Sequence, residues 1–266
     1  MTPTRRPVLL AMAVLGYVIM IVPVLFIVAA SITESSTLSF PPQGFSLRWF
    51  GDALTYEPFR SSLVSSLLLA ALATTIALAL GVPAALALAR GRIPARGLAE
   101  TLFFSPLVVP ELVLGLALYQ QMVILLGFRS FTALLVGHVA ILLPYTVRVT
   151  GSALTLTDTS LEDAARGLGA GPWYTFRTIT LPIMRPGIVS AAMLSFITSF
   201  NNVPLSLLLQ SRQFSTFPIT LLDYVQQSYT PMIAAMSTLI LIATIVAAVV
   251  AERTVGFARI FGGIQQ

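Results

Sequence analysis

Four polar side chains stand out in this sequence because they fall inside long apolar stretches. Glu111 is the only acidic residue placed in such a stretch, His138 is the only histidine, and Asn201 and Asn202 are adjacent. A carboxylate in apolar surroundings either contacts a polar solute or a proton, or joins two helices by a hydrogen bond in its protonated form. Together with Tyr145, these residues are the candidates for a solute pathway.

Each candidate has a structural alternative. A histidine without partners at ligand spacing does not predict a metal site, and it can serve as a hydrogen-bonded structural residue instead. The Asn201-Asn202 pair precedes Pro204, so the helix there either opens toward a cavity or only kinks for packing. Tyr145 offers an aromatic face to a cation, but tyrosine is also common at membrane interfaces.

The elements that position these residues are predicted to be membrane-spanning helices. Hydrophobic residues are 56% and charged residues 9% of the 266, and the mean hydropathy is +0.90. Ordinary globular proteins carry about 25% charged residues, so a soluble protein is excluded, as is a disordered chain. A span needs about 20 mainly apolar residues. Six stretches qualify: 8–31, 61–89, 101–126, 131–150, 187–210 and 232–251.

We therefore predict an all-α membrane protein in which residues 1–266 form a single transmembrane domain. The first span follows Arg5 and Arg6, as in a signal peptide, but its apolar run is too long and ends without a clean cleavage site. Alanine recurs through the second span, which predicts close packing against another helix rather than lipid.

The arginines predict the orientation, because cytoplasmic loops carry an excess of positive charge. A cytoplasmic N-terminus leaves only Arg48, Arg60, Arg129 and Arg212 outside. The other eleven arginines then lie inside, and both termini of this multi-pass protein are cytoplasmic. Inside are Arg5, Arg6, Arg90, Arg92, Arg96, Arg148, Arg166, Arg177, Arg185, Arg253 and Arg259.

Several chemistries are excluded by residues that the chain lacks. Without lysine it has no P-loop, so any ATP hydrolysis belongs to another chain. Without cysteine it has no disulfide, thiolate metal site or cysteine nucleophile. No serine-hydrolase or zinc-protease motif occurs, which argues against an intramembrane enzyme and predicts no catalytic residues and no metal. Scattered arginines do not indicate nucleic-acid binding.

The longest predicted cytoplasmic connection, 151–186, is patterned as a folded element. Ser160 and Asp163 form a start that is similar to a capping box, and apolar residues then recur at helical spacing. Gly169 stops this helix, and a second short helix is expected from Trp173 to about Ile179, before Pro182. A helix lying on the lipid surface is the alternative, but its acidic start suits anionic headgroups poorly.

The residues of this connection resemble a family signature. Asp163-Ala164-Ala165, Gly169 and Ile179-Thr180-Leu181-Pro182 keep every spacing of the EAA signature of permease subunits of binding-protein-dependent ABC importers, with Asp for the first Glu. The segments Ser105-Pro106 and Leu143-Pro144-Tyr145 are similar to the same permeases. Residues 45–50 and 199–204 resemble the spermidine/putrescine-type branch, whose members often have acidic residues where this chain has Asn201 and Asn202.

The resemblance implies a type I importer permease fold, a location in a bacterial inner membrane and a set of partners. In the family, this loop forms a coupling helix that docks on a separate ATPase, which binds ATP and Mg; no cofactor is expected in this chain. The implied partners are two ATPase copies, a second and different permease, an external solute-binding protein and membrane lipid. The residues implied to couple with the ATPase are Glu162, Asp163, Ala164, Ala165, Gly169, Ile179, Leu181 and Pro182.

The resemblance also implies the activity, which is import of a small organic solute by alternating access. A polyamine or a related amine or amino-acid derivative fits the branch, while the two amides leave neutral and zwitterionic solutes open. A channel or receptor that works alone is the alternative function, although no charge ring or filter-like repeat occurs.

Overall fold

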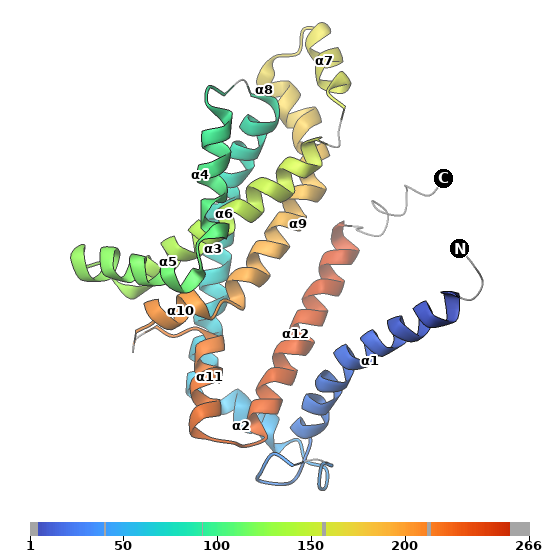
Figure 1. The fold of residues 1–266 in the computed structure, drawn as a ribbon, viewed down its shortest axis with the longest axis vertical. Coiled ribbons are helices and arrows are strands. Elements are labelled where there is room, and N and C mark those ends of the chain that lie inside the picture. The colour runs from blue at the N-terminus through green and yellow to red at the C-terminus, as the bar shows by residue number, and fades with distance from the viewer. Residues whose placement is uncertain (1–4, 40, 92, 156–157, 212–213, 256–266) are drawn as a thin grey trace. The chain divides into compact units, whose positions relative to one another are not determined.

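The structure is a computed structural model that describes residues 5–39, 41–91, 93–155, 158–211 and 214–255. Arg92, Arg212 and Arg259, which contribute to the predicted orientation, lie outside these residues. The described chain is nearly all helical, as expected from its composition (Figure 1). The elements are α1 (Arg5–Ser31), α2 (Arg48–Thr55), α3 (Glu57–Arg90), α4 (Arg96–Val108), α5 (Glu111–Leu118), η1 (Tyr119–Leu125), α6 (Ser130–Thr155), α7 (Ser160–Gly167), α8 (Pro172–Thr175), η2 (Phe176–Thr180), α9 (Leu181–Phe200), α10 (Pro204–Leu209), α11 (Phe217–Gln227) and α12 (Met232–Val255).

The chain falls into two compact units. The first contains α1, α2 and most of α12, from the ranges Met1–Ser61 and Thr220–Arg253. The second contains Ser62–Ile219, and every candidate site residue lies in it.

In the first unit, α1 exposes its apolar side chains over residues 8–27. None of its most apolar window is buried, and Leu10 and Met20 are 67% and 73% exposed. Such a surface suits lipid or another membrane helix. The chain after α1 is ordered by Trp49, whose indole N–H donates to the Thr33 carbonyl over 3.1 Å.

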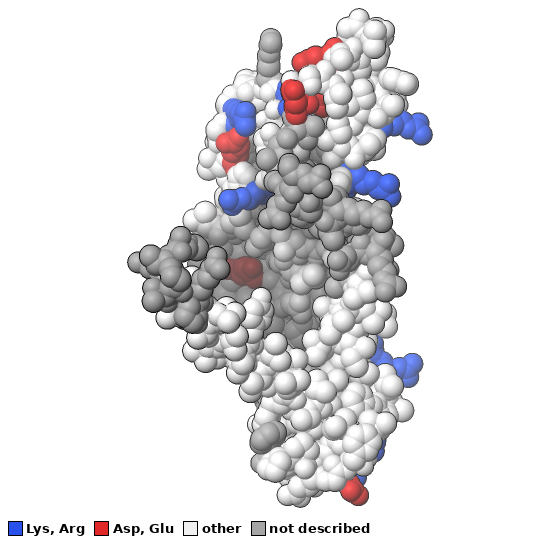
Figure 2. All heavy atoms as spheres, turned by 90° about the vertical axis from the view of Figure 1, so that its right-hand side faces the viewer, with Lys and Arg blue, Asp and Glu red and all other residues white. Residues whose placement is uncertain are grey.

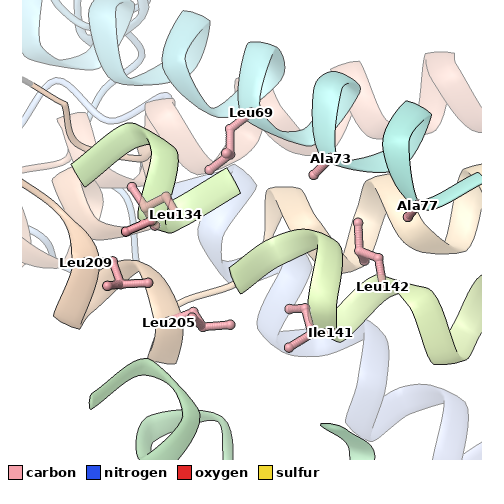
Figure 3. Packing of buried hydrophobic residues seen from close by; sticks show 9 residues of the cluster. Leu69, Ala73, Ala77, Leu134, Ile141, Leu142, Leu205 and Leu209 are labelled. Carbon is pink, nitrogen blue, oxygen red and sulfur yellow. The ribbon is translucent and has the colours of Figure 1, made fainter. Parts of the chain in front are cut away.

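In the second unit, small residues of α3 let α6 approach closely. Ala73 and Ala77 are fully buried against Leu134 and Leu142 of α6 (Figure 3). The Thr146 hydroxyl of α6 donates to the Ala77 carbonyl over 3.2 Å. The predicted helix-facing role of the alanine-rich span is thus confirmed at these positions. Leucines of α10 complete the same core (Figure 3).

Four helices are long and apolar enough to span a membrane: Val8–Ser31, Glu57–Arg90, Ser130–Thr155 and Pro172–Phe200. These correspond to the predicted first, second, fourth and fifth spans. The predicted sixth span, 232–251, falls in α12, where the apolar helix is shorter, at Met232–Val246. The described residues therefore give four spans, or five with the bent pair described next.

The predicted third span, 101–126, is not one straight helix. It consists of α4 and a second helix, α5 continued by η1, which bend by 99° at a short break. Val109 is extended there, with φ −79° and ψ 127°, because the ring of Pro110 disfavours the helical conformation for the residue before it.

The predicted fifth span also differs, because helix continues through Pro182 and stops earlier than 210. The helix runs from α8 through the π-helical turn η2 into α9 without interruption. A proline inside an α-helix clashes with the carbonyl four residues earlier, and the wider π-turn immediately before Pro182 relieves that clash. The prediction that the second loop helix ends before Pro182 is therefore wrong.

Candidate functional site

Glu111 and Asn202 are joined by a short hydrogen bond in the second unit. The Asn202 side-chain amide donates to Glu111 Oε2 over 2.7 Å, and Asn202 Oδ1 accepts the Leu205 backbone N–H over 3.1 Å. Asn202 is buried and Glu111 half-buried. The side chain of Asn202 thus fixes the start of α10 and holds a carboxylate that keeps part of its surface open.

His138 lies in the same region, between two serine side chains. Its Nδ1 atom is 2.7 Å from Ser199 Oγ and its Nε2 atom is 3.5 Å from Ser206 Oγ. The ring and both serines are buried. This arrangement ties α6 to the end of α9 and to α10. Below, "the polar network" means Glu111, His138, Ser199, Asn202 and Ser206.

Two helix breaks meet at the polar network. Glu111 is the first residue of α5, directly after the bend, and Asn202 lies between α9 and α10. The helix is interrupted at the asparagine pair, since α9 ends at Phe200 and α10 starts at Pro204. Helix breaks at membrane depth are tolerated where they are buried in protein or line a cavity, and they are common at solute sites of carriers.

The structure brings together some of the predicted pathway residues but not all of them. Glu111 and Asn202 are in contact, and His138 reaches them through residues of α9 and α10. Asn201 is exposed at the end of α9. Tyr145 is half-buried on α6, seven residues after His138, so it lies about 10 Å further along the helix.

Ser199 and Ser206 were not predicted. A buried histidine requires hydrogen-bond partners. Counting the helical rise from the ends of the predicted fourth and fifth spans places both serines within about 6 Å of the depth of His138, and this was the available signal.

The second candidate site is the α7–η2 segment, residues 158–182. The helix α7 begins at Ser160, as predicted, but its N-cap residue Thr159 makes no side-chain cap hydrogen bond. Asp158 Oδ1, just before it, accepts the Ser160 N–H over 3.1 Å. The predicted capping box of Ser160 and Asp163 is therefore wrong. Asp163 is instead paired with Arg166 at 3.1 Å. Hydrogen bonds from Ser160 hold the pKa of the Asp158 carboxyl below its usual value, so this carboxyl is charged at neutral pH.

Gly169 provides the predicted break after α7. Its φ of +88° is one that residues with a Cβ rarely adopt, and the chain turns there into α8. Apolar side chains are exposed around this turn: Leu161 is 57%, Leu168 90% and Trp173 71% exposed.

The predicted coupling residues divide by exposure. Asp163, Ala164, Gly169, Leu181 and Pro182 are exposed, and Ala165 and Ile179 are intermediate. Glu162 is buried: it lies 3.6 Å from Arg90 Nε and accepts a 3.0 Å hydrogen bond from Thr180 Oγ1. Arg90 and Thr180 were not predicted as site residues. Figure 2 shows acidic and basic side chains next to one another at the end of the molecule that carries α7.

Apolar helices that break around a half-buried carboxylate, and an exposed helix-glycine-helix segment, together define a membrane transport protein. The chain belongs to the family described as the binding-protein-dependent transport system inner membrane component, which it matches over residues 77–256. It is thus a multi-pass inner-membrane permease of an ABC importer. Members of this family are transport permeases rather than enzymes, and membership implies an ATPase, a binding protein and a second permease as partners.

Relatives and solved structures agree with this assignment. The chain is 33% identical over 244 residues to the putrescine transport system permease protein PotI of Escherichia coli K12, covering 89% of this chain and 86% of the relative. It is 25% identical to the spermidine/putrescine permease PotC of the same strain, with 89% of both chains covered. A bacterial ABC transporter involved in alginate import has the same fold, with a TM-score of 0.72 at 17% identity, covering 95% and 98% of the chains. The predicted permease class of the spermidine/putrescine-type branch is confirmed.

Proposed function

We propose that this chain forms one half of a solute pathway, that a different permease completes it, and that the pair imports a small organic amine by alternating access. The polar network supports the division into halves, because its polar groups line only one side of a pathway. They are too few to enclose a solute. Solute sites of such carriers lie near the midplane, at the interface between two halves.

The Glu111–Asn202 contact is the observation that carries the proposed substrate class. A half-buried carboxylate binds an ammonium group by charge-assisted hydrogen bonds, which are stronger than neutral ones. PotI and PotC are named for putrescine and spermidine, so a polyamine-like solute fits. The amides of Asn201 and Asn202 add no charge, so a related amine or amino-acid derivative fits as well.

Coupling to ATP hydrolysis is assigned to the α7–η2 segment. Two ATPase copies, each binding ATP and Mg, would receive the exposed apolar side chains near Gly169, together with Asp163 and Ala164. A short helix laid in a groove of a partner is a recurrent docking mode. An external binding protein delivers the solute from the opposite side of the membrane, so this segment lies in the cytoplasm, and the arginine distribution assigns both termini to the same side.

Uptake by the reconstituted importer tests the substrate class. Liposomes containing this permease, its partner permease and the ATPase are supplied with binding protein and labelled putrescine as the probe diamine. Because Gln keeps the shape of Glu but loses its charge, Glu111→Gln should lower uptake about tenfold or more. Glu100→Gln is the matched control, since the Glu100 side chain is 42% exposed and pairs with Arg96 on its own helix.

Wild-type uptake by a Glu111→Gln/Asn202→Leu double variant would show that the solute passes elsewhere. An importer that is active without a second permease would contradict the division into halves.

A further inference from the structure

Glu162 is buried although it belongs to a short helix whose other acidic residue is exposed. The side chain of Glu162 is 7% exposed, whereas that of its neighbour Asp163 is 63% exposed. Burying a carboxylate is unfavourable unless charges and hydrogen bonds compensate it. The surroundings of Glu162 must therefore supply that compensation.

The compensating groups come from three elements. Arg90 Nε, at the end of α3, lies 3.6 Å from Glu162 Oε2, and Arg166 Nη2, on α7 itself, lies 3.7 Å from the same oxygen. The other oxygen, Oε1, accepts the hydrogen bond from Thr180 of η2. Thus one carboxylate connects α7 to α3 and to the start of the long helix α9.

Arg90 extends this connection to α6. Its Nη2 donates to the Leu154 carbonyl over 3.2 Å, in the last turn of α6, where free carbonyls carry partial negative charge. Nearby, Leu88 of α3 packs with Val147 of α6 in a buried cluster. Arg90 therefore holds Glu162 and the end of α6 at the same time.

A buried group of this kind is poorly placed to contact another protein. Glu162 has little surface left, and its lone pairs are directed at residues of its own chain. The exposed side chains of Leu168 and Trp173 are the groups available for docking. Glu162, which directly precedes the signature residue Asp163, is accordingly explained by contacts inside the permease.

We propose that Glu162 and Arg90 are positioning residues that fix α7 to the ends of α3 and α6, so that displacement of α7 moves these helices together. This inference rests on the proposed docking of an ATPase on the α7–η2 segment. Loss of the pair should leave the docked ATPase in place but disconnect its motion from the membrane helices.

The test compares Arg90→Gln, Glu162→Gln and the double variant in the complete importer, each corrected for the amount of assembled complex. Arg90→Gln should lower both uptake and the stimulation of ATPase activity by loaded binding protein about tenfold, while the ATPase co-purifies at the wild-type ratio. Arg96→Gln is the control, because the Arg96 side chain is 58% exposed and pairs only within α4 among the described contacts.

The double variant gives a readout that a general structural defect would not produce. Arg90→Gln alone leaves a buried carboxylate without its main partner, and adding Glu162→Gln removes that charge. The double variant should therefore be no worse, and should accumulate in membranes better, than Arg90→Gln. If Arg90→Gln does not accumulate, Glu162→Gln and the double variant are compared for stimulation and uptake.

Three outcomes overturn the inference: full stimulation and uptake in both single variants, additive defects in the double variant, or loss of the ATPase in proportion to the lost activity. The last would make these residues part of the docking surface. Failure of the ATPase to co-purify with the wild-type permease is a different result, because it refutes the proposed function itself.

Discussion

His138 and Glu111 have different roles at the scale of single residues, although both are ionisable groups in apolar helices. His138 is fully buried, and both ring nitrogens face serine hydroxyls. Glu111 is half-buried, and its carboxylate accepts a hydrogen bond from the Asn202 side chain. The geometry therefore favours a structural role for the histidine and leaves the carboxylate as the group for solute contact.

Removing the Ser199 hydroxyl should destabilise the protein, because it leaves a ring nitrogen buried without its nearest partner. We expect Ser199→Ala to lower the free energy of unfolding by about 1–3 kcal/mol. Thermal unfolding of the detergent-purified permease measures the change. Ser190→Ala is the control on the same helix, where the hydroxyl bonds only to the Pro186 carbonyl one turn earlier. Equal effects of the two substitutions would contradict the role of Ser199.

Sequence reasoning found the residues with rare chemistry but not their partners. Glu111, His138 and Asn202 were recognisable because ionisable and amide groups are unusual in apolar spans. Ser199, Thr180 and Arg90 are common residue types at such positions, and only the packing of distant helices shows what they contact. The buried state of Glu162 is hidden for the same reason, since its main ion-pair partner lies 72 positions earlier in the chain.

At the scale of elements, the break at Gly169 sets the orientation of α7 relative to α8. Its positive φ strains any residue with a branched Cβ, although no neighbouring atom would clash with it. Gly169→Val should therefore cost about 1–3 kcal/mol locally and reorient α7, so that transport and ATPase stimulation are lost while the protein still inserts.

A series of substitutions makes this prediction specific to the backbone. Gly169→Asn should keep more activity than Gly169→Val, because asparagine tolerates positive φ better. Gly167→Val is the control, since Gly167 also has open space but no positive φ. Wild-type stimulation by Gly169→Val, or an equal loss with Gly167→Val, would refute the role of the turn.

The close approach of α3 and α6 gives a second prediction for elements. A Cβ on Gly81 would overlap the side chain of Thr146. Gly81→Ala should therefore destabilise the permease by about 1–3 kcal/mol, as overpacking does. Gly97→Ala, where nothing lies near the added atom, should change the melting temperature little. Part of the Gly81→Ala loss should return when Thr146 is also changed to Ala; no recovery would assign the loss to another cause.

Helix types were predictable from the apolar pattern, and helix breaks only in part. The pattern predicted the bounds of α1, α3 and α6 closely, because a long apolar segment in lipid satisfies its backbone hydrogen bonds by forming a helix. It missed the 99° bend before Glu111 and the continuity through Pro182. Both sites contain proline. Whether a proline breaks its helix, bends it or is accommodated by a π-turn depends on the neighbouring helices.

For the whole molecule, the arginine distribution predicts orientation, and the absence of cysteine makes it simple to test. Single cysteines replace Leu168 and Phe45, which are 90% and 70% exposed. In intact cells treated with an impermeant maleimide, the cysteine at Phe45 should react and the one at Leu168 should not. Labelling in the opposite pattern would invert the topology.

The uninterrupted run from α8 through η2 to α9 has a mechanical consequence. Residues 172–200 form one rod about 43 Å long, with the α7–η2 segment at one end and Ser199 at the other. If the rod pivots near the Glu162–Thr180 contact, a tilt of about 5° displaces its far end by about 3 Å, as follows from the helical rise. A small displacement of the α7–η2 segment, where the ATPase is proposed to dock, would then move the Ser199 end far enough to separate the hydrogen-bonded groups of the polar network.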